Sequence, residues 1–463
     1  MINKLSNLIY KILPVYFQNF IISLYGLYWK KRRYSGDFVS QTLNFVQREQ
    51  SSLEDWNTYQ TKELRKLLIH AFTNVPYYKK KYTAAGLKLE DFKNFQLNDL
   101  KKLPYLEKQE LREFGNNILL STNKSKGDFY SSSGSTGTPI QVFFSKNFHQ
   151  IWSAAYEVRV RNWAGVNHKM RRGMIGGRRV VPNAIASPPY YRYNYFEKQT
   201  YFSAYHLSAD TVKNYMSGLI ENNVEYLVGY AMSIYFWADF INSDPSIKSI
   251  QLKAVLTSSE KLTDKMRDTI ERAFLCKVYD GYSGVEACGL ISENKFGELL
   301  FSPDTGILEV LDERGNQVLN GESGEVIATG LLNYDQPLIR YRIGDRVKLS
   351  TSQSSISNLA FPIIEEIEGR IEDVIIAADG RKMVRFHGIF IKINGLKAAQ
   401  LIQHKLDFLE INLVVDNYYL KESEKTIFKR LESQLGQVKV KFSYLDSLPL
   451  TKGGKIKAVV SHL

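Results

Sequence analysis

The chain has 463 residues, of which 44% are hydrophobic and 13% aromatic, and its formal net charge at pH 7 is +13. Twelve prolines against 29 tyrosines argue against disorder, and the length suffices for two or three domains. Two cysteines, Cys276 and Cys288, exclude a disulfide scaffold and a four-cysteine zinc site, and they favour a reducing compartment such as the cytoplasm. No nucleic-acid-binding motif accompanies the charge, so we expect no nucleic-acid partner.

The first 35 residues combine apolar and basic character. Residues 5–29 are rich in Ile, Leu, Tyr and Phe, and the basic run KKRR follows at 30–33. Pro14, Gln18 and Asn19 interrupt the apolar run, so we expect neither a spanning helix nor a signal peptide. Two interpretations stay open: a peripheral membrane-surface segment with a basic end, and a helix packed on the main domain, which we favour.

Three later segments have the apolar spacing of helices. The first, residues 64–82, predicts an amphipathic helix that stops before Val75 and Pro76, because proline disfavours helical backbone at the preceding residue. The other two are residues 211–222 and 231–242.

Short apolar segments predict strands between and after these helices. Residues 224–228 and 253–256 alternate with the helical segments, which predicts parallel strands with crossover helices. Residues 307–311 and 324–329 flank a turn-forming stretch and predict a hairpin.

A stretch rich in serine and glycine, YSSSGSTGTP at residues 130–139, carries six hydroxyl side chains, two glycines and no charge. Glycine lets the backbone turn tightly and aim several N–H groups at one place, and hydroxyls rotate to suit a ligand. The stretch therefore suits the oxygens of a polyphosphate, although it lacks the Gly-Lys-Ser/Thr of a Walker A loop. A flexible linker is the alternative.

The middle of the chain combines arginine with tyrosine. Residues 169–172 and 178–179 are Arg-rich and precede the tyrosine run PYYRYNYF at 189–196. This pattern suits a sugar, an acidic substrate or a nucleotide, but we favour a basic surface beside a half-buried sheet. For His206 we favour a buried, hydrogen-bonded role over catalysis.

Five segments in chain order resemble the motifs of the adenylate-forming ligases. The stretch at 130–139 resembles their phosphate-binding loop, and GYSGVE at 281–286 resembles their aromatic–glycine–acid motif. PLIRYRIGD at 337–345 resembles their ribose-binding segment, EGRIED at 368–373 their hinge, and LPLTKGGKI at 448–456 their C-terminal lysine motif. One match would be weak, but five in the same order make a specific signal.

Further segments resemble the phenylacetate–CoA ligase branch of that superfamily, which includes the CapK-type proteins of capsule and surface-polysaccharide loci. They are HA at 70–71, VPYY at 75–78, LPYLEK at 103–108 and YLVGY at 226–230. The resemblance extends from about residue 64 to the C-terminus.

The resemblance implies the α/β fold of the adenylate-forming enzymes. A large N-terminal domain, residues 1–369, would have mixed and parallel sheets and a β-rich subdomain, and would bind nucleotide and acyl group. Residues 1–60 would be a loosely matched N-terminal extension of it. A small mobile α+β domain, residues 370–463, would act as a lid.

The resemblance also implies a nucleotide site. The β- and γ-phosphates of ATP would be held by Ser132, Ser133, Gly134, Ser135, Thr136 and Gly137. Tyr282 would stack on adenine, Asp345 would accept from both ribose hydroxyls, and Arg370 would contact ribose or phosphate. For Asp345, a structural ion pair with Arg340 or Arg342 is the alternative.

The remaining implied roles concern the metal, the hinge and the reaction. Glu286 would bind Mg²⁺, which prefers carboxylate, phosphate and water oxygens. Glu372 or Asp373 would be the hinge, and Lys455 would supply positive charge during adenylation, a solvated basic tail being the alternative. Val285 departs from the family pattern, because a hydroxyl residue usually precedes the glutamate and could donate to the α-phosphate.

We therefore expect an ATP-dependent, AMP-forming carboxylate ligase that acts on a small carboxylate. Its acceptor would be the thiol of coenzyme A or an amine of a surface polysaccharide precursor. The alternatives are a catalytically impaired nucleotide-binding protein and a membrane-associated scaffold of a polysaccharide assembly complex.

Overall fold

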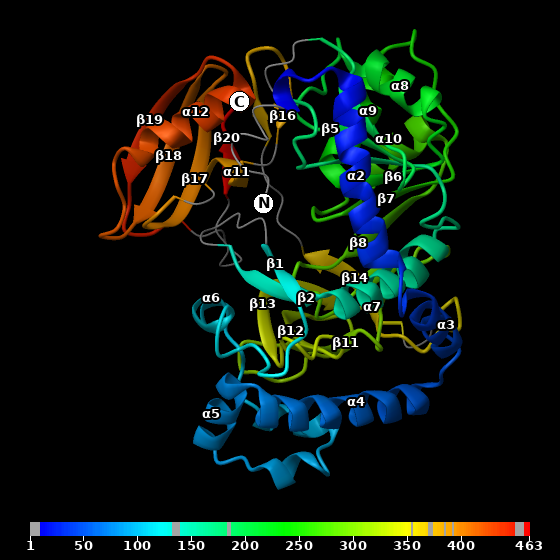
Figure 1. Cartoon of the computed structure of the whole chain (residues 1–463), viewed down its shortest axis with the longest axis vertical. Helices are drawn as coiled ribbons and strands as arrows, with labels where there is room; N and C mark the ends of the chain where they lie inside the picture. The colour runs from blue at the N-terminus through cyan, green and yellow to red at the C-terminus, as the bar shows by residue number, and fades with distance from the viewer. Residues whose placement is uncertain are drawn as a thin grey trace.

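The computed structural model describes residues 10–131, 139–182, 187–352, 355–368, 374–383, 386–390, 393–449 and 458–463. A large mixed sheet with its helices forms the main body, and a smaller sheet near the C-terminus forms a separate unit beside it (Figure 1). Several predicted site residues lie outside the described residues: Ser132, Ser133, Gly134, Ser135, Thr136, Gly137, Arg370, Glu372, Asp373 and Lys455.

One half of the 12-stranded sheet is parallel, in the order β5-β3-β6-β7-β8. The strands are β3 (Arg172–Gly176), β5 (Gln199–Ser203), β6 (Tyr226–Tyr230), β7 (Ala254–Ser258) and β8 (Val278–Tyr282), and the helices between them include α8 (Val212–Glu221), α9 (Ala231–Ser243) and α10 (Asp264–Phe274). Their apolar side chains form one core cluster. The predicted parallel strands and crossover helices are thus confirmed.

The other half of the sheet is antiparallel and continues from β8 in the order β9-β10-β14-β13-β12-β11. Its strands are β9 (Ile291–Glu293), β10 (Leu299–Phe301), β11 (Gly306–Leu311), β12 (Ser323–Gly330), β13 (Tyr341–Leu349) and β14 (Ile363–Glu368). The predicted hairpin is confirmed, since β11 pairs with β12 from Gly306 opposite Gly330 to Leu311 opposite Glu325.

Two helices take the place of the single helix predicted over residues 64–82. The helix α4 (Leu53–Asn74) begins earlier than predicted, where Ser52 and Asp55 form a capping box. It ends before Val75 as predicted, but α5 (Pro76–Ala84) starts at once, because proline is well tolerated in the first helical turn.

The N-terminal helix α2 (Val15–Tyr34) packs on the main body, against β4 (Tyr191–Asn194) and α7 (Lys146–Tyr156). This confirms the favoured interpretation of a packed helix. The basic run at 30–33 is divided, however, because Arg32 donates to the Phe144 carbonyl at 2.8 Å and Arg33 pairs with Glu197 at 2.8 Å. Only its two lysines are exposed, so the run does not offer four charges to a membrane. Among the described helices, none has the length and apolarity required to cross a membrane.

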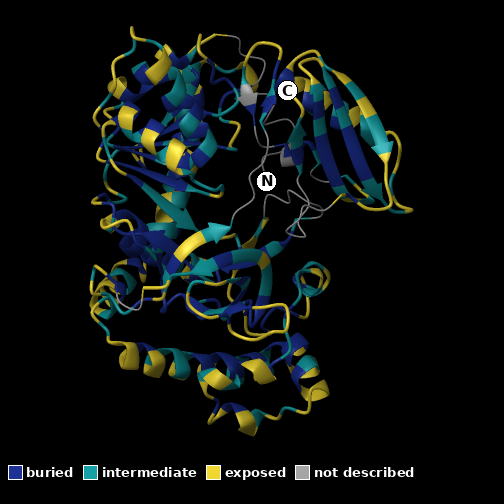
Figure 2. Cartoon of the chain, turned by 180° about the vertical axis from the view of Figure 1, so that it is seen from behind, coloured by how far each residue is buried: buried dark blue, intermediate teal, exposed yellow. Residues whose placement is uncertain are grey.

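The C-terminal unit is a four-stranded sheet in the order β19-β18-β17-β20, with α12 (Ser423–Leu435) contributing to its core. The strands are β17 (Leu396–Lys405), β18 (Phe408–Val415), β19 (Lys439–Tyr444) and β20 (Val459–Ser461). Buried residues concentrate in the two central strands, β17 and β18, whereas the edge strand β19 is intermediate to exposed (Figure 2). The predicted boundary at residues 369 and 370 falls outside the described residues and stays a prediction.

Candidate functional site

The strand β8 lies where the parallel half of the sheet meets the antiparallel half. It pairs in parallel with β7 and antiparallel with β9. Tyr282 is its last residue, so residues 283–286 follow its carboxyl end. Ligands of open α/β sheets bind beyond the carboxyl ends of the parallel strands, where the topology changes. The predicted aromatic–glycine–acid motif therefore occupies a favourable position for a ligand site.

Tyr282 and Asp345 come from two predicted motifs and are hydrogen-bonded to each other. The Tyr282 hydroxyl donates to Oδ2 of Asp345 at 2.8 Å, and Asp345 lies on β13. Burial, together with the neighbouring Asp345 charge, raises the pKa of Tyr282 well above its usual value, so this hydroxyl stays a donor. An ionised carboxylate can accept about four hydrogen bonds, and the Tyr282 hydroxyl supplies one of them.

Glu286 is a buried carboxylate, with only 8% of its surface exposed. The Tyr341 hydroxyl donates to its Oε1 at 3.4 Å. The pKa of Glu286 is raised above its ordinary value, mainly because the carboxyl group is buried. The Lys108 charge opposes this shift, and the nearby Asp345 charge adds to it. A buried carboxyl group with a raised pKa would gain from a cation beside it, which makes Glu286 suitable for Mg²⁺.

The donor set around Glu286 fits a metal that keeps other ligands. The described residues contain no group of three or more His, Cys, Asp or Glu side chains placed to hold a metal. Mg²⁺ usually binds through one or two carboxylates together with substrate phosphates and water. A single buried glutamate is therefore compatible with a Mg²⁺–nucleotide site and does not fit a metal site made of protein ligands alone.

The described flanks of the serine/glycine stretch lie in the same region. The strands β1 (Gly127–Ser131) and β2 (Gln141–Ser145) pair on either side of the stretch, with Ser131 opposite Gln141. Gln336 accepts from the Phe143 backbone N–H at 2.7 Å, and Asn333 donates to the Phe143 carbonyl at 3.0 Å. The chain just before the 337–345 motif is thereby hydrogen-bonded to the β1–β2 pair.

Apolar contacts join the same pieces. A single core cluster contains Ile140 next to the stretch, Ala287 and Cys288 next to Glu286, and Tyr341 at the start of β13. The described parts of three predicted motifs therefore meet, although the phosphate-loop side chains themselves lie outside the described residues.

The two arginines considered as alternative partners of Asp345 pair with other carboxylates. Arg340 pairs with Glu309 through two hydrogen bonds of 2.8 and 3.0 Å and donates to the Leu103 carbonyl. Arg342 pairs with Glu325 at 2.6 Å and Glu107 at 3.3 Å. The two arginines of this motif thus fix its backbone to neighbouring segments.

Lys108 and Asp280 are two candidate site residues that sequence reasoning missed. Lys108 opens α6 (Lys108–Phe114), and its Nζ donates to the Ile343 carbonyl at 3.4 Å, two residues before Asp345. The LPYLEK segment held a signal for it, a lysine in a family-like stretch. Asp280 lies on β8 and accepts from Thr257 at 3.1 Å, and burial raises its pKa to about 7.

Other polar residues of the parallel half have structural partners. Glu260 accepts from the backbone N–H of Met232 at 2.9 Å, at the start of α9. His206 bonds Ser203 at 2.7 Å, and burial lowers its pKa to about 4, which agrees with the favoured structural role. The tyrosine run forms β4, the edge strand beneath α2.

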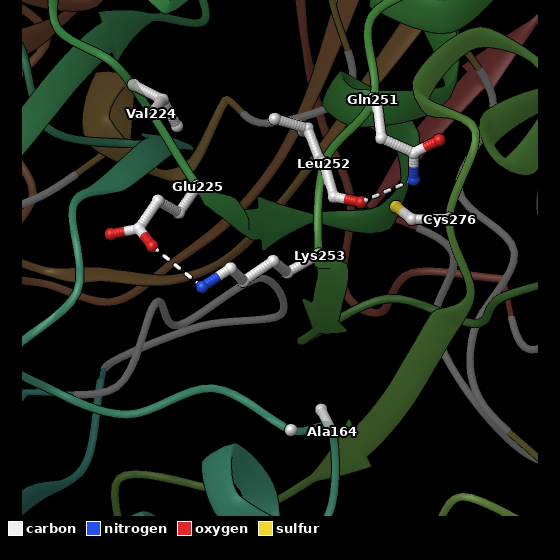
Figure 3. A pocket seen from close by; sticks show the side chains of 8 residues that line it. Ala164, Val224, Glu225, Gln251, Leu252, Lys253 and Cys276 are labelled. Carbon is white, nitrogen blue, oxygen red and sulfur yellow. Dashed lines mark hydrogen bonds and ion pairs between the residues drawn. The ribbon is translucent and has the colours of Figure 1, made fainter.

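A pocket of about 570 Å³ lies at the other end of the parallel strands (Figure 3). Its lining includes Glu225, Lys253 and Cys276. Glu225 immediately precedes β6, Lys253 immediately precedes β7, and Cys276 lies two residues before β8. Glu225 and Lys253 form an ion pair of 2.9 Å, and burial raises the pKa of Cys276 to about 12. The pocket is thus at the amino ends of the strands, away from the predicted motifs.

Solved structures identify the class of fold. Structures of 2-hydroxyisobutyryl-CoA ligase are similar to this chain. One, in complex with 2-HIB-AMP and CoA in the thioesterification state, has a TM-score of 0.57 at 17% identity and covers 90% of this chain and 91% of its own. An open conformation has a TM-score of 0.55 at 18% identity, with coverages of 89% and 93%. The fold is that of the adenylate-forming ligases, as the sequence predicted.

Relatives found by sequence indicate which branch of these ligases the chain resembles. Protein CapK of Staphylococcus aureus is 28% identical over 468 residues, 99% of each chain. The phenylacetate-coenzyme A ligase of Escherichia coli K12 is 26% identical over 71% of this chain and 74% of its own. Residues 375–462 match the family described as the CapK C-terminal domain. The resemblance to the phenylacetate–CoA ligase branch and its CapK-type proteins is thus confirmed.

Proposed function

We propose that this protein is an ATP-dependent, AMP-forming ligase that joins a small carboxylate to ATP as an acyl-adenylate and then transfers the acyl group. One observation carries the proposal: Tyr282, Glu286 and Asp345, taken from two family-like motifs, gather beyond the carboxyl end of β8. The relatives named phenylacetate-coenzyme A ligase support the same class of reaction.

In the first half-reaction, a carboxylate oxygen of the substrate attacks the α-phosphorus of ATP and pyrophosphate leaves. Asp345 would hold the ribose, while residues 132–137 and Arg370 would hold phosphate or ribose oxygens. Glu286 would hold Mg²⁺, which when bound neutralises phosphate charge. Lys455 would stabilise the charge that develops on the reacting oxygens. Glu372 or Asp373 would let the C-terminal unit turn between the two half-reactions.

In the second half-reaction, a nucleophile attacks the acyl carbon and AMP leaves. Coenzyme A is the first acceptor to test, because several relatives are named for it. An amine is the second, since CapK, the relative that matches 99% of the chain, does not carry the name of a coenzyme A ligase. We place the reaction in surface or capsular polysaccharide biosynthesis in the cytoplasm.

A nucleotide-binding protein that has lost catalysis is the second candidate function. Its support is Val285, which is half-buried and packs against the core that contains Ile140 and Tyr341, so it offers no hydroxyl to an α-phosphate. Pyrophosphate release by the wild type distinguishes the two, and a Val285→Thr variant tests the contact to the α-phosphate. If the protein is an active ligase with a weakened contact, this variant should release pyrophosphate as fast as the wild type or faster.

The test of the proposed function is pyrophosphate release with ATP, Mg²⁺ and a panel of aryl, alkyl and hydroxy carboxylates. We expect release with at least one carboxylate and, in a second step, AMP release that depends on coenzyme A or on an added amine. ATP binding without pyrophosphate release for any carboxylate would favour the second candidate. Absence of ATP binding by the folded protein would contradict both.

A further inference from the structure

The helix α2 docks on the main body through its polar side. Its partner β4 is the last strand of the large sheet, so within the described part of the chain one row of β4 backbone groups has no neighbouring strand. Asn19 accepts from the Tyr193 backbone N–H at 3.0 Å, and Ser23 accepts from that of Tyr195 at 3.1 Å. The residues that interrupt the apolar sequence therefore satisfy an otherwise open sheet edge.

Two further contacts fix α2 in this orientation. Gln18 is buried and accepts from Nε of Arg192 at 2.5 Å. At Gly26 a Cβ would lie 2.1 Å from the amide nitrogen of Asn194, so a larger residue would push the helix away. The side of α2 that faces the body is thus set by polar bonds and by close backbone approach.

The outward side of α2 is consequently apolar. Its exposed residues, with their exposed fractions, are Tyr16 (73%), Phe17 (51%), Phe20 (54%), Ile21 (40%), Leu24 (50%), Tyr25 (50%) and Tyr28 (49%). Spacings of three and four residues place these side chains on one face, which we call the α2 outer face. No charged residue occurs from Ile12 to Trp29. A surface helix normally has the opposite polarity, with its apolar side toward the core.

The charges around the α2 outer face indicate what covers it. Lys11 precedes the helix, Lys30 and Lys31 lie in its last turns, and all three are exposed. Residues 1–36 contain no Asp or Glu. Positive charge beside an apolar surface complements an anionic lipid headgroup layer. Tyrosine and tryptophan are also typical of the boundary between membrane and water, where an apolar ring and a polar group are both satisfied.

We propose that the α2 outer face is a docking surface for an anionic lipid bilayer. The helix would lie in the plane of the interface with its aromatic residues among the acyl chains and with its lysines at the headgroups. Figure 1 shows α2 extended along one face of the main body, with the C-terminal unit beside that body. The proposal does not depend on ligase activity.

The test is co-sedimentation of the full chain with vesicles of phosphatidylcholine and phosphatidylglycerol at a 3:1 ratio, compared with pure phosphatidylcholine. We expect binding to the anionic vesicles that the Phe20→Ser/Leu24→Ser double variant reduces at least tenfold, because each buried apolar side chain contributes strongly to partitioning. The matched control is Leu319→Ser/Ile356→Ser, which changes residues exposed by 72% and 73% outside α2 and should bind as the wild type does.

A second pair of variants isolates the charge. Lys30→Gln and Lys31→Gln should each weaken binding to the anionic vesicles by about fivefold at low salt, and Lys421→Gln should not. Point variants are preferable to removal of residues 1–35, because a truncated chain loses the bonds that Asn19, Ser23 and Arg32 make to the body. The thermal midpoint of each variant should match the wild type, since the changed side chains are exposed.

Two results would overturn the proposal. One is equal vesicle binding by the wild type and the Phe20→Ser/Leu24→Ser variant, or negligible binding by both at low salt. The other is a concentration-dependent dimer in light scattering that this variant abolishes without any vesicle binding by the wild type. The dimer would assign the α2 outer face to a second copy of the chain.

Discussion

The two ends of the parallel strands differ in how their charged groups are balanced. At the amino ends, Glu225 and Lys253 neutralise each other across 2.9 Å, and Cys276 is held as an unreactive thiol by its raised pKa. At the carboxyl end of β8, burial and the nearby Asp345 charge raise the pKa of Glu286 above its ordinary value. A buried carboxyl group with a raised pKa is the expected arrangement where a cationic ligand completes the site.

The largest expected effect concerns catalysis at the carboxyl end. Lys455→Ala should slow acyl-adenylate formation by about 10²–10³-fold and leave ATP affinity nearly unchanged, because one transition-state donor is lost. Pyrophosphate release measures the rate, and calorimetry measures the affinity. Lys457→Ala is the matched control in the same segment and should retain the wild-type rate. Wild-type adenylation by Lys455→Ala would remove Lys455 from the site.

The next effect concerns nucleotide binding. Asp345→Ala should weaken ATP binding by roughly 10- to 150-fold, since a hydrogen bond to a charged acceptor contributes about 1.5–3 kcal/mol. The titration should be made with the folded variant, verified by its thermal midpoint. If the affinity of Asp345→Ala equals that of the wild type, the ribose assignment is wrong.

A third prediction uses the raised pKa of Asp280. Its value of about 7 in the folded protein lies above the ordinary value of 3.8, so the folded state retains a proton that the unfolded chain releases. The free energy of unfolding should therefore fall as pH rises from about 4 to 7. Asp280→Asn should be more stable than the wild type at pH 8, by about 1–4 kcal/mol, and equally stable at pH 4.

Urea unfolding at pH 4, 6 and 8 measures this difference. Asp446→Asn, which changes an exposed aspartate, is the control and should show no such dependence on pH. A stability difference for Asp280→Asn that stays constant over this range would show that Asp280 titrates normally.

The smallest effect is expected at the amino ends. Glu225→Gln should change the free energy of unfolding by about 0.2–1 kcal/mol, as for other partly exposed ion pairs, and ATP affinity by less than about twofold. The same calorimetric titration as for Asp345→Ala provides the measurement. A large loss of ATP affinity in Glu225→Gln would place the nucleotide in the pocket beside Cys276. The ligand site would then lie at the amino ends of the parallel strands and not at the carboxyl ends.

The sequence predicted the meeting of Tyr282 with Asp345 because each lies in a motif whose order along the chain is specific. It also predicted the parallel strands, since apolar runs such as residues 224–228 alternate with helical spacing. Asp280 could not be predicted as a site residue, because its role depends on Thr257, a neighbour distant in the chain. The LPYLEK segment held a signal for Lys108, but the contact of Lys108 with Ile343 exists only in the folded chain.

The sequence alone also does not predict the orientation of α2. Apolar spacing predicts that a helix has an apolar face, but it does not say which face meets the body. Here Asn19 and Ser23 turn inward because the open edge of β4 needs hydrogen-bond partners, and this edge exists only in the folded sheet. The division of the basic run has the same origin, because buried Arg32 donates to the Phe144 carbonyl and half-buried Arg33 pairs with Glu197.

The central claim is that ATP binds beyond the carboxyl end of β8. The most direct test is photo-labelling of the full chain with 8-azido-ATP and Mg²⁺, followed by peptide mapping, with excess ATP as competitor. We expect ATP-protected label within residues 278–293 or 337–349, which contain Tyr282, Glu286 and Asp345. Protected label confined to the residues around Glu225, Lys253 and Cys276 would contradict the claim.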